Sequence, residues 1–136
     1  TVVLPHMSDG SYIINVSSIA SFVPNARMTV YSSTKAYVTS FSKALRYELK
    51  MQKKGINCLV VCPGPMRTEF LPVAGINGNS KAFEVLPYCD PVTVAEKSVK
   101  RAESGKGFYT PRFFFKFYRV VAKILPHNWL MGMAKT

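Results

Sequence analysis

The spacing of apolar residues changes along this chain, and each change predicts a strand or a helix. Continuous apolar runs at residues 11–17 and 56–62 predict two buried strands. Between them, from about residue 30 to residue 53, apolar side chains recur at helical spacing, and two lysines and a glycine close the segment. A strand, a long helix and a second strand in this order predict a right-handed crossover in a parallel sheet.

The remaining sequence predicts smaller elements and a long irregular segment at residues 66–87. Asp90 followed by Pro91 is typical of a helix start, so we expect a helix that extends to about Glu103. The other expected elements are the end of a helix at 1–7, a short strand at 108–110, a helix at 112–125 and a short helical piece after residue 126. The fold class predicted by this pattern is α/β.

Composition and charge narrow the possible partners. The chain has 136 residues, enough for one domain with a core, and a formal net charge of +11. Such a charge favours nucleic acid, an anionic membrane or an anionic cofactor, but no nucleic-acid motif accompanies it, so we expect no nucleic-acid partner. No apolar run reaches the roughly 18 residues of a membrane span.

The three cysteines form neither a metal-binding set nor an even disulfide framework. Cys58 and Cys62 would stand roughly 13 Å apart along one strand, too far for a disulfide. We therefore expect reduced, buried thiols in a cytoplasmic protein, with no metal site.

Tyr31 and Lys35 stand four residues apart at the beginning of the long predicted helix, so they share one face of it. A free phenol has a pKa of about 10. An ammonium roughly 5 Å away, at an effective dielectric of about 20, favours the phenolate by ~3 kcal/mol. Tyr31 would then serve as a general acid or base. The alternative is an exposed tyrosine beside a solvated lysine.

Three features fall at the carboxyl ends of the predicted strands, where open parallel sheets bind their ligands. Ser18 follows the first strand, Tyr31 and Lys35 open the next helix, and a turn at residues 63–68 follows the second strand. A hydroxyl, an activated phenol and a glycine-containing turn at one sheet edge suit hydride transfer at a carbonyl or an alcohol.

With these features the chain resembles the short-chain dehydrogenase/reductase family of the classical type. The match consists of residues 10–18, then Tyr31-Ser32-Ser33-Thr34-Lys35 thirteen residues past Ser18, then Pro63-Gly64 and Thr68 after the next strand. It covers residue 1 to about residue 110, the carboxyl half of a typical member. The resemblance implies the carboxyl-terminal half of a Rossmann-like doubly wound parallel sheet. It divides the chain into a catalytic half at 1–111 and a basic, aromatic helical tail at 112–136.

The resemblance also implies a role for each matching residue. Ser18 would orient the substrate oxygen, whereas the neighbouring Ser17 would pack at the strand end. Tyr31 would donate or take the proton, and Lys35 would favour its ionisation and hold the ribose hydroxyls of the cofactor, NAD or NADP. The residues expected on the nicotinamide side are Pro63, Gly64, Met66 and Thr68.

The family's glycine-rich cofactor fingerprint is missing from the printed sequence. We therefore expect the chain to be a fragment, inactive alone, whose adenine and pyrophosphate site and whose choice between NAD and NADP come from other sequence. Its first strand would expose an apolar edge. Two alternatives stay open: a non-catalytic fragment or binding module that cannot bind cofactor, and a basic domain whose charge is its function.

The loop after the Pro-Gly turn is expected to cover the substrate. Its apolar side chains favour a hydrophobic or lipid-like carbonyl compound, unless they simply bury against the sheet; they are Phe70, Leu71, Val73, Ile76, Phe83 and Leu86. The resemblance further implies a homo-oligomer formed through the tyrosine-bearing helix. The candidate contact residues there are Phe41, Leu45 and Leu49, provided that they do not belong to the core.

The tail predicts an amphipathic helix at residues 112–125, with one basic stripe formed by Arg112, Lys116, Arg119 and Lys123. Aromatic and aliphatic residues fill its other faces. Such a helix can lie in a membrane interface, close over a substrate pocket, pack at a subunit interface or pack on the core with a solvated basic face.

Overall fold

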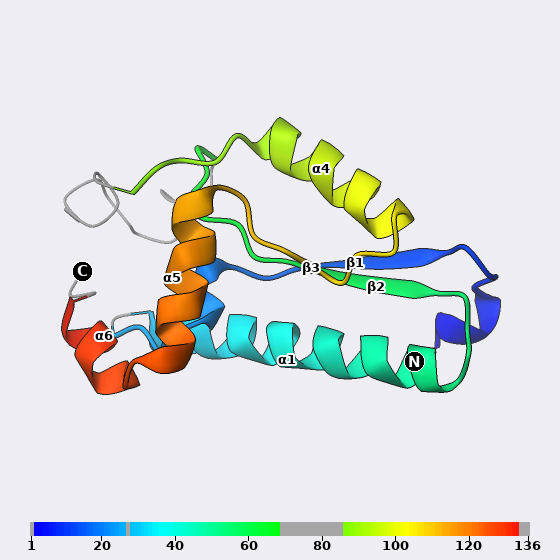
Figure 1. Ribbon diagram of the computed structural model, residues 1–136, viewed down its shortest axis with the longest axis horizontal. Coiled ribbons are helices and arrows are strands. Elements are labelled where there is room, and N and C mark those ends of the chain that lie inside the picture. Colours follow the sequence, from blue (N-terminus) through cyan, green and yellow to red (C-terminus); the bar gives the residue numbers. More distant parts are fainter. Residues whose placement is uncertain (1, 27, 69–85, 134–136) are drawn as a thin grey trace.

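The computed structural model describes residues 2–26, 28–68 and 86–133 as a layered α/β fold (Figure 1). Its elements are, in order, the 3-10 helix η1 (Leu4–His6), β1 (Tyr12–Val16), the 3-10 helix η2 (Ile19–Ser21), α1 (Thr29–Met51), β2 (Asn57–Val61), α4 (Pro91–Glu103), β3 (Phe108–Tyr109), α5 (Phe113–Ile124) and α6 (His127–Met133). The predicted order of the strands and of the helices after β1 is confirmed, whereas the helix end expected at 1–7 is only the three-residue 3-10 helix η1. In the described part of the chain, no helix is both long enough and apolar enough to cross a membrane.

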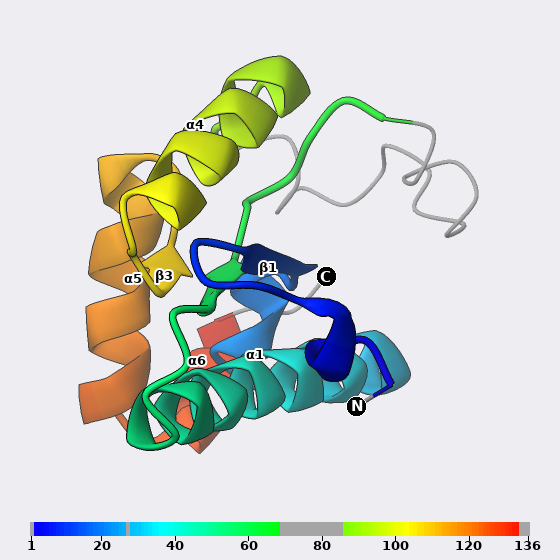
Figure 2. The same cartoon turned by 90° about the vertical axis from the view of Figure 1, so that its right-hand side faces the viewer.

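The sheet has three parallel strands in the order β1-β2-β3. Tyr12 pairs with Asn57 and Val16 with Val61, while the two residues of β3 pair with the end of β2. Helices α1 and α4 lie on opposite faces of the sheet (Figure 2). Helix α5 crosses the layers near the carboxyl ends of the strands, on the β3 side (Figures 1 and 2).

The expectation that β1 is a buried strand was wrong. Its central residues are half-buried, whereas Tyr12 and Val16 at its ends are exposed, Val16 at 57%. Among the described residues β1 pairs only with β2, so its other edge is unpaired, which confirms the expectation that the first strand exposes an edge. The central strand β2 is the buried one, because neighbours flank it on both sides and α1 and α4 cover its faces.

One part of the core lies between the sheet and α1, and it decides which of the candidate oligomer-contact residues belong to the core. Leu45 and Leu49, which we expected as candidates for an oligomer contact, are 8% and 1% exposed and pack with Ile56 and Cys58. Their spacing of four residues puts both on the helix face that meets the sheet. Phe41 stays largely exposed on another face of α1.

Hydrogen bonds from Arg46 and Asn57 hold the short strand β3 in register. Arg46 donates from Nη2 to the carbonyl oxygen of Gly105 at 2.8 Å and from Nη1 to Oδ1 of Asn57. Asn57 in turn donates from Nδ2 to the carbonyl oxygens of Ala102 and Lys106, at 2.7 and 2.9 Å. A two-residue strand gains little from its own ladder, so these bonds to the preceding turn fix its position.

The three cysteines are free thiols, and all three are buried. Burial raises the pKa of the thiols of Cys58 and Cys62 above its usual value. The fold therefore confirms the expectation of buried thiols.

Helix α5 docks on the turn after β2, where the ring of Phe115 lies against Gly64. Phe115 is completely buried, and a Cβ atom added to Gly64 would lie only 2.2 Å from its Cε2 atom. Only a residue without a side chain fits at position 64 while the ring keeps its place.

We expect the substitution Gly64→Ala to lower the free energy of unfolding by about 1–3 kcal/mol, because the new methyl group must displace the buried ring of Phe115. Urea unfolding followed by circular dichroism measures this loss. The matched control is Gly132→Ala in α6, where a Cβ atom meets no other atom within 4 Å. That control should be neutral or stabilising by up to about 1 kcal/mol. Equal midpoints for the parent and Gly64→Ala would contradict the docking of α5.

Candidate active site

Ser17, at the carboxyl end of β1, ties this strand to α1. Its Oγ donates to the carbonyl oxygen of Lys35 at 2.8 Å and lies 2.7 Å from Oγ1 of Thr39. The side chain is almost completely buried. Because its O–H already donates within the protein and the side chain is buried, Ser17 holds the helix against the strand and has no free donor for a substrate.

Ser18 has a different environment, although it is the next residue. Its Oγ accepts a hydrogen bond from the backbone N–H of Ala20 at 3.2 Å and so caps the 3-10 helix η2. A serine hydroxyl has one donor and two acceptor positions. Because this contact uses it as an acceptor, the Ser18 O–H can donate to the oxygen of a bound molecule.

Lys35 connects Tyr31 with the end of β1. Its Nζ lies 5.7 Å from the centroid of the Tyr31 ring, as expected for residues four apart on one helix. The same Nζ donates to the carbonyl oxygen of Val16 at 3.0 Å. An ammonium, a phenol and the strand end that leads to Ser18 therefore lie at one edge of the fold.

The loop between η2 and α1 is held on the first turn of the helix, beside Tyr31. The N–H of Asn25 donates to Oγ of Ser32 at 3.3 Å, and the N–H of Ser32 donates to the carbonyl oxygen of Met28 at 2.8 Å. Oδ1 of Asn25 is buried and has no partner among the described residues.

The turn after β2 lies against the same region. The carbonyl oxygen of Pro63 accepts from the N–H of Ile19 at 3.0 Å, which joins this turn to the residue after Ser18. The N–H of Ser17 likewise donates to the carbonyl oxygen of Val61 at 2.7 Å. The structure thus brings Pro63 close to the Ser18 turn.

The other residues expected at the cofactor have varied surroundings. Gly64 is in contact with Phe115, as described above. Met66 is half-buried on the core and forms a bridge with Cys89. Thr68 is exposed, and its N–H donates to the carbonyl oxygen of Met66 at 3.0 Å.

Most of the expected substrate cover lies outside the described residues. This holds for Phe70, Leu71, Val73, Ile76 and Phe83. Leu86 lies within the described residues and packs against the core cluster that includes Val94 and Ala102 of α4.

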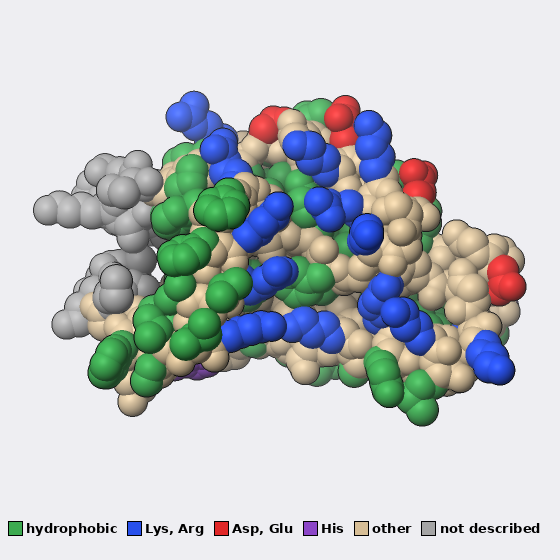
Figure 3. Space-filling model, in the orientation of Figure 1, with side chains coloured by type: hydrophobic (Ala, Val, Ile, Leu, Met, Phe, Trp, Pro, Cys, Tyr) green, Lys and Arg blue, Asp and Glu red, His purple; other side chains and the backbone are tan. Residues whose placement is uncertain are grey.

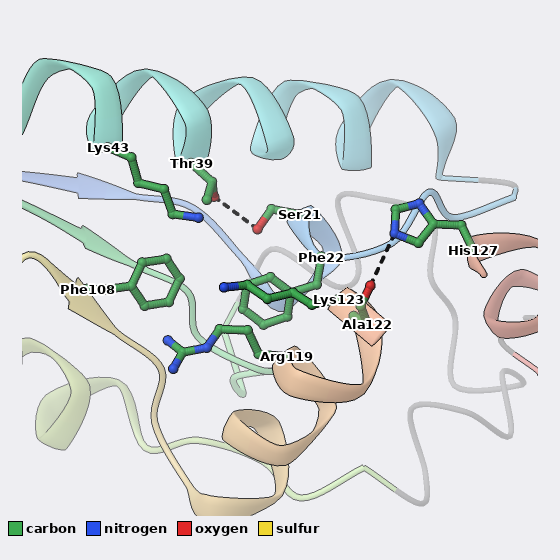
Figure 4. Close-up of a pocket in the computed structure, with 9 residues that line it drawn as sticks. All are labelled: Ser21, Phe22, Thr39, Lys43, Phe108, Arg119, Ala122, Lys123 and His127. Atoms are coloured by element: carbon green, nitrogen blue, oxygen red, sulfur yellow. Dashed lines mark hydrogen bonds between the residues drawn. The ribbon is translucent and has the colours of Figure 1, made fainter. Parts of the chain in front are cut away.

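A pocket of about 520 Å³ lies elsewhere, where α1, β3, α5 and α6 meet (Figure 4). Cationic and aromatic side chains from these elements line it, and Ser18, Tyr31 and Lys35 do not. Sequence reasoning missed this pocket, because its walls come from segments far apart in the chain. The only signal was the basic stripe that contains Arg119 and Lys123.

Comparison with known proteins identifies what this arrangement is similar to. The sequence profile of the short chain dehydrogenase family matches residues 1–75. The uncharacterized oxidoreductase YhxC of Bacillus subtilis is 39% identical over 72 residues, which cover 53% of this chain and 25% of that protein. The uncharacterized oxidoreductase TDA5 of Saccharomyces cerevisiae is 30% identical over 114 residues, which cover 82% of this chain and 34% of that protein.

A solved structure extends the likeness to the fold. A short-chain dehydrogenase from Sphingobium yanoikuyae, determined in complex with NADPH, superimposes with a TM-score of 0.63 and 24% identity. The superposition covers 89% of this chain and 44% of that one. The chain therefore spans about a quarter of YhxC, about a third of TDA5 and less than half of this structure.

The different contacts of the two serines predict different losses of stability. We expect Ser17→Ala to lower the free energy of unfolding by about 1–3 kcal/mol, because Lys35 and Thr39 lose a buried partner. Ser18→Ala should cost about 0.5 kcal/mol, because it removes only the cap of a three-residue helix. Urea unfolding of both variants measures the difference. A loss for Ser18→Ala that equals or exceeds that of Ser17→Ala would contradict this division of roles.

Proposed function

The chain belongs to the short chain dehydrogenase family, and on this basis we propose that it supplies the catalytic half of an oxidoreductase that interconverts a carbonyl compound and an alcohol. The cofactor in this proposal is NAD or NADP. The observation that carries the proposal is the contact of Lys35 with both the Tyr31 ring and the end of β1, next to Ser18.

In this proposal Tyr31 moves the proton and Ser18 holds the reacting oxygen. During reduction the Ser18 hydroxyl donates a hydrogen bond to the carbonyl oxygen of the substrate, and the Tyr31 hydroxyl transfers its proton to that oxygen. The nicotinamide, when bound, supplies the hydride that adds to the carbonyl carbon. In the reverse direction the Tyr31 phenolate takes the proton from the alcohol.

Lys35 fits the ribose end of such a cofactor. An ammonium group has three N–H donors, and the bond to the Val16 oxygen uses one of them. The others can bind ribose hydroxyls, while the charge stabilises the negative charge that develops on the Tyr31 oxygen. Pro63, Gly64, Met66 and Thr68 belong to the turn that we assign to the nicotinamide side.

The proposal also covers the substrate class, the rest of the cofactor site and the oligomeric state. The substrate would be hydrophobic or lipid-like, and the glycine-rich half of the cofactor site would come from sequence outside the printed chain. A homo-oligomer could form through the exposed side of α1, where Tyr37 and Phe41 stack with ring centroids 6.0 Å apart. The alternative remains a non-catalytic module that binds no cofactor.

Removal of the proposed proton donor gives the direct test. In a protein that joins this chain to the glycine-rich half of the cofactor site, we expect Tyr31→Phe to lower kcat/KM for reduction of a hydrophobic ketone by about 10²–10⁴-fold, because general acid catalysis is lost. The matched control is Tyr47→Phe, which removes the hydroxyl of an exposed tyrosine on the same helix. Calorimetric titration of this joined protein with NADH and NADPH should give saturable binding in the parent and in both variants. Full activity of Tyr31→Phe would refute the assigned role, and the absence of binding to either nucleotide would favour the non-catalytic module.

A second function, contact with an anionic membrane surface, is favoured by the outer face of α5. Phe113 and Phe117 are 82% and 60% exposed, and Ile124 continues their row. Figure 3 shows hydrophobic side chains in a band over α5, beside many lysines and arginines. Aromatic side chains next to basic ones suit the boundary between lipid headgroups and acyl chains.

We expect the protein to co-sediment with vesicles that contain phosphatidylserine, and the double variant Phe113→Ser/Phe117→Ser to weaken this binding at least about tenfold. Each ring that enters the lipid contributes about 1.5–3 kcal/mol. The matched control is Tyr47→Ser/Met51→Ser, another exposed pair with the same spacing, on α1. Equal losses in the two double variants, or no binding by the parent, would exclude a membrane contact through α5.

A further inference from the structure

The pocket between α1 and α5 gathers three positive charges around one space. Lys43 comes from α1, whereas Arg119 and Lys123 stand one turn apart on α5 (Figure 4). Burial, together with the charges of Lys123 and Arg119, lowers the pKa of Lys43 below its usual value. In the described part of the chain, no carboxylate is among the groups that act on this lysine. Lys123 and Arg119 therefore repel the ammonium of Lys43, and among the described groups that act on this lysine only the thiol of Cys62 opposes that repulsion.

Aromatic contacts hold two of these cations in place. Nζ of Lys43 lies 5.2 Å from the centroid of the Phe108 ring, and Cζ of Arg119 lies 4.5 Å from the same centroid. Phe22 stacks on Phe108 with ring centroids 6.4 Å apart. Cation–π attraction offsets part of the repulsion and fixes the positions of both charges before any ligand arrives.

The remaining lining combines hydroxyl groups and an imidazole. Oγ1 of Thr39 donates to Oγ of Ser21 at 3.0 Å, and Nε2 of His127 lies 3.3 Å from the carbonyl oxygen of Ala122. A volume of about 520 Å³ exceeds that of a bare anion and falls within the usual range for small organic ligands. The pocket thus has room for an organic group against its aromatic wall.

We propose that this pocket binds the phosphate group of an organic phosphate monoester, held by Lys43, Arg119 and Lys123. Three cations match a doubly charged oxyanion, and the planar guanidinium of Arg119 can donate two parallel hydrogen bonds to it. Phe22 and Phe108 would contact the organic group. The phosphate can belong to a soluble molecule or to the head of a lipid such as phosphatidic acid. The site does not depend on the proposed oxidoreductase activity, because it contains none of Ser18, Tyr31 and Lys35.

Removal of one pocket cation tests the proposal without endangering the fold. Lys123→Gln relieves repulsion in the empty pocket, so the variant should be as stable as the parent or more stable. The matched control is Lys116→Gln, which removes the same charge from an exposed position on α5 that does not line the pocket. The probes are phenyl phosphate, inorganic phosphate and vesicles of phosphatidic acid, all at constant ionic strength.

We expect phenyl phosphate to raise the melting temperature of the parent and to give saturable binding by calorimetry. Lys123→Gln should weaken this binding about 10–100-fold, because a hydrogen bond to a charged group is lost, while Lys116→Gln changes it less than about twofold. Tighter binding of phenyl phosphate than of inorganic phosphate identifies a soluble monoester. Binding to phosphatidic acid vesicles alone, lost in Lys123→Gln and kept in Lys116→Gln, identifies the lipid head.

Two results would overturn the proposal. One is the absence of binding to all three probes. The other is an equal loss in Lys123→Gln and Lys116→Gln, which would mean that the anions respond to the overall charge of +11 and not to the pocket. A Tyr31→Phe variant that binds phenyl phosphate normally keeps this result separate from the test of the oxidoreductase activity.

Discussion

The two ends of Lys35 hold the carboxyl end of β1 against α1, and the candidate active site depends on this junction. The main-chain carbonyl of Lys35 accepts from Ser17, and its ammonium donates to the carbonyl oxygen of Val16. The strand end and the first turns of the helix therefore cannot move independently. This arrangement fixes Ser18 and Tyr31 at the same edge of the sheet, and it leaves the Ser18 hydroxyl as a donor because Ser17 makes the structural contacts.

Helix α5 has three faces with different surroundings: one packs on the sheet, one lines the pocket and one is exposed. Phe115 packs on the turn after β2, where only glycine leaves room for the ring. Arg119 and Lys123 enter the pocket beside Lys43, and Phe113 and Phe117 point outward. One short helix thus packs on the Pro63-Gly64 turn, supplies two of the three pocket cations and exposes two phenylalanine rings.

The edges of the sheet are stabilised in different ways. The two-residue strand β3 is fixed by the bonds of Arg46 and Asn57 to the preceding turn. Strand β1 has one partner and an exposed outer edge among the described residues. The unpaired N–H and C=O groups of such an edge can pair with a further strand. The solved short-chain dehydrogenase from Sphingobium yanoikuyae is more than twice as long as this chain.

The sequence alone determined the crossover of β1, α1 and β2, the start of α4 at Asp90-Pro91, and the Ser18, Tyr31 and Lys35 motif with its family. These features are local, because periodicity, capping and short spacings are encoded within one element or one turn. Only the tertiary structure decided that Leu45 and Leu49 face the core while Phe41 stays exposed. It also decided that Gly64 receives the ring of Phe115 and that Lys43 meets Arg119 and Lys123. Those contacts join segments far apart in the chain, and they depend on how helices pack on the sheet, which no local pattern records.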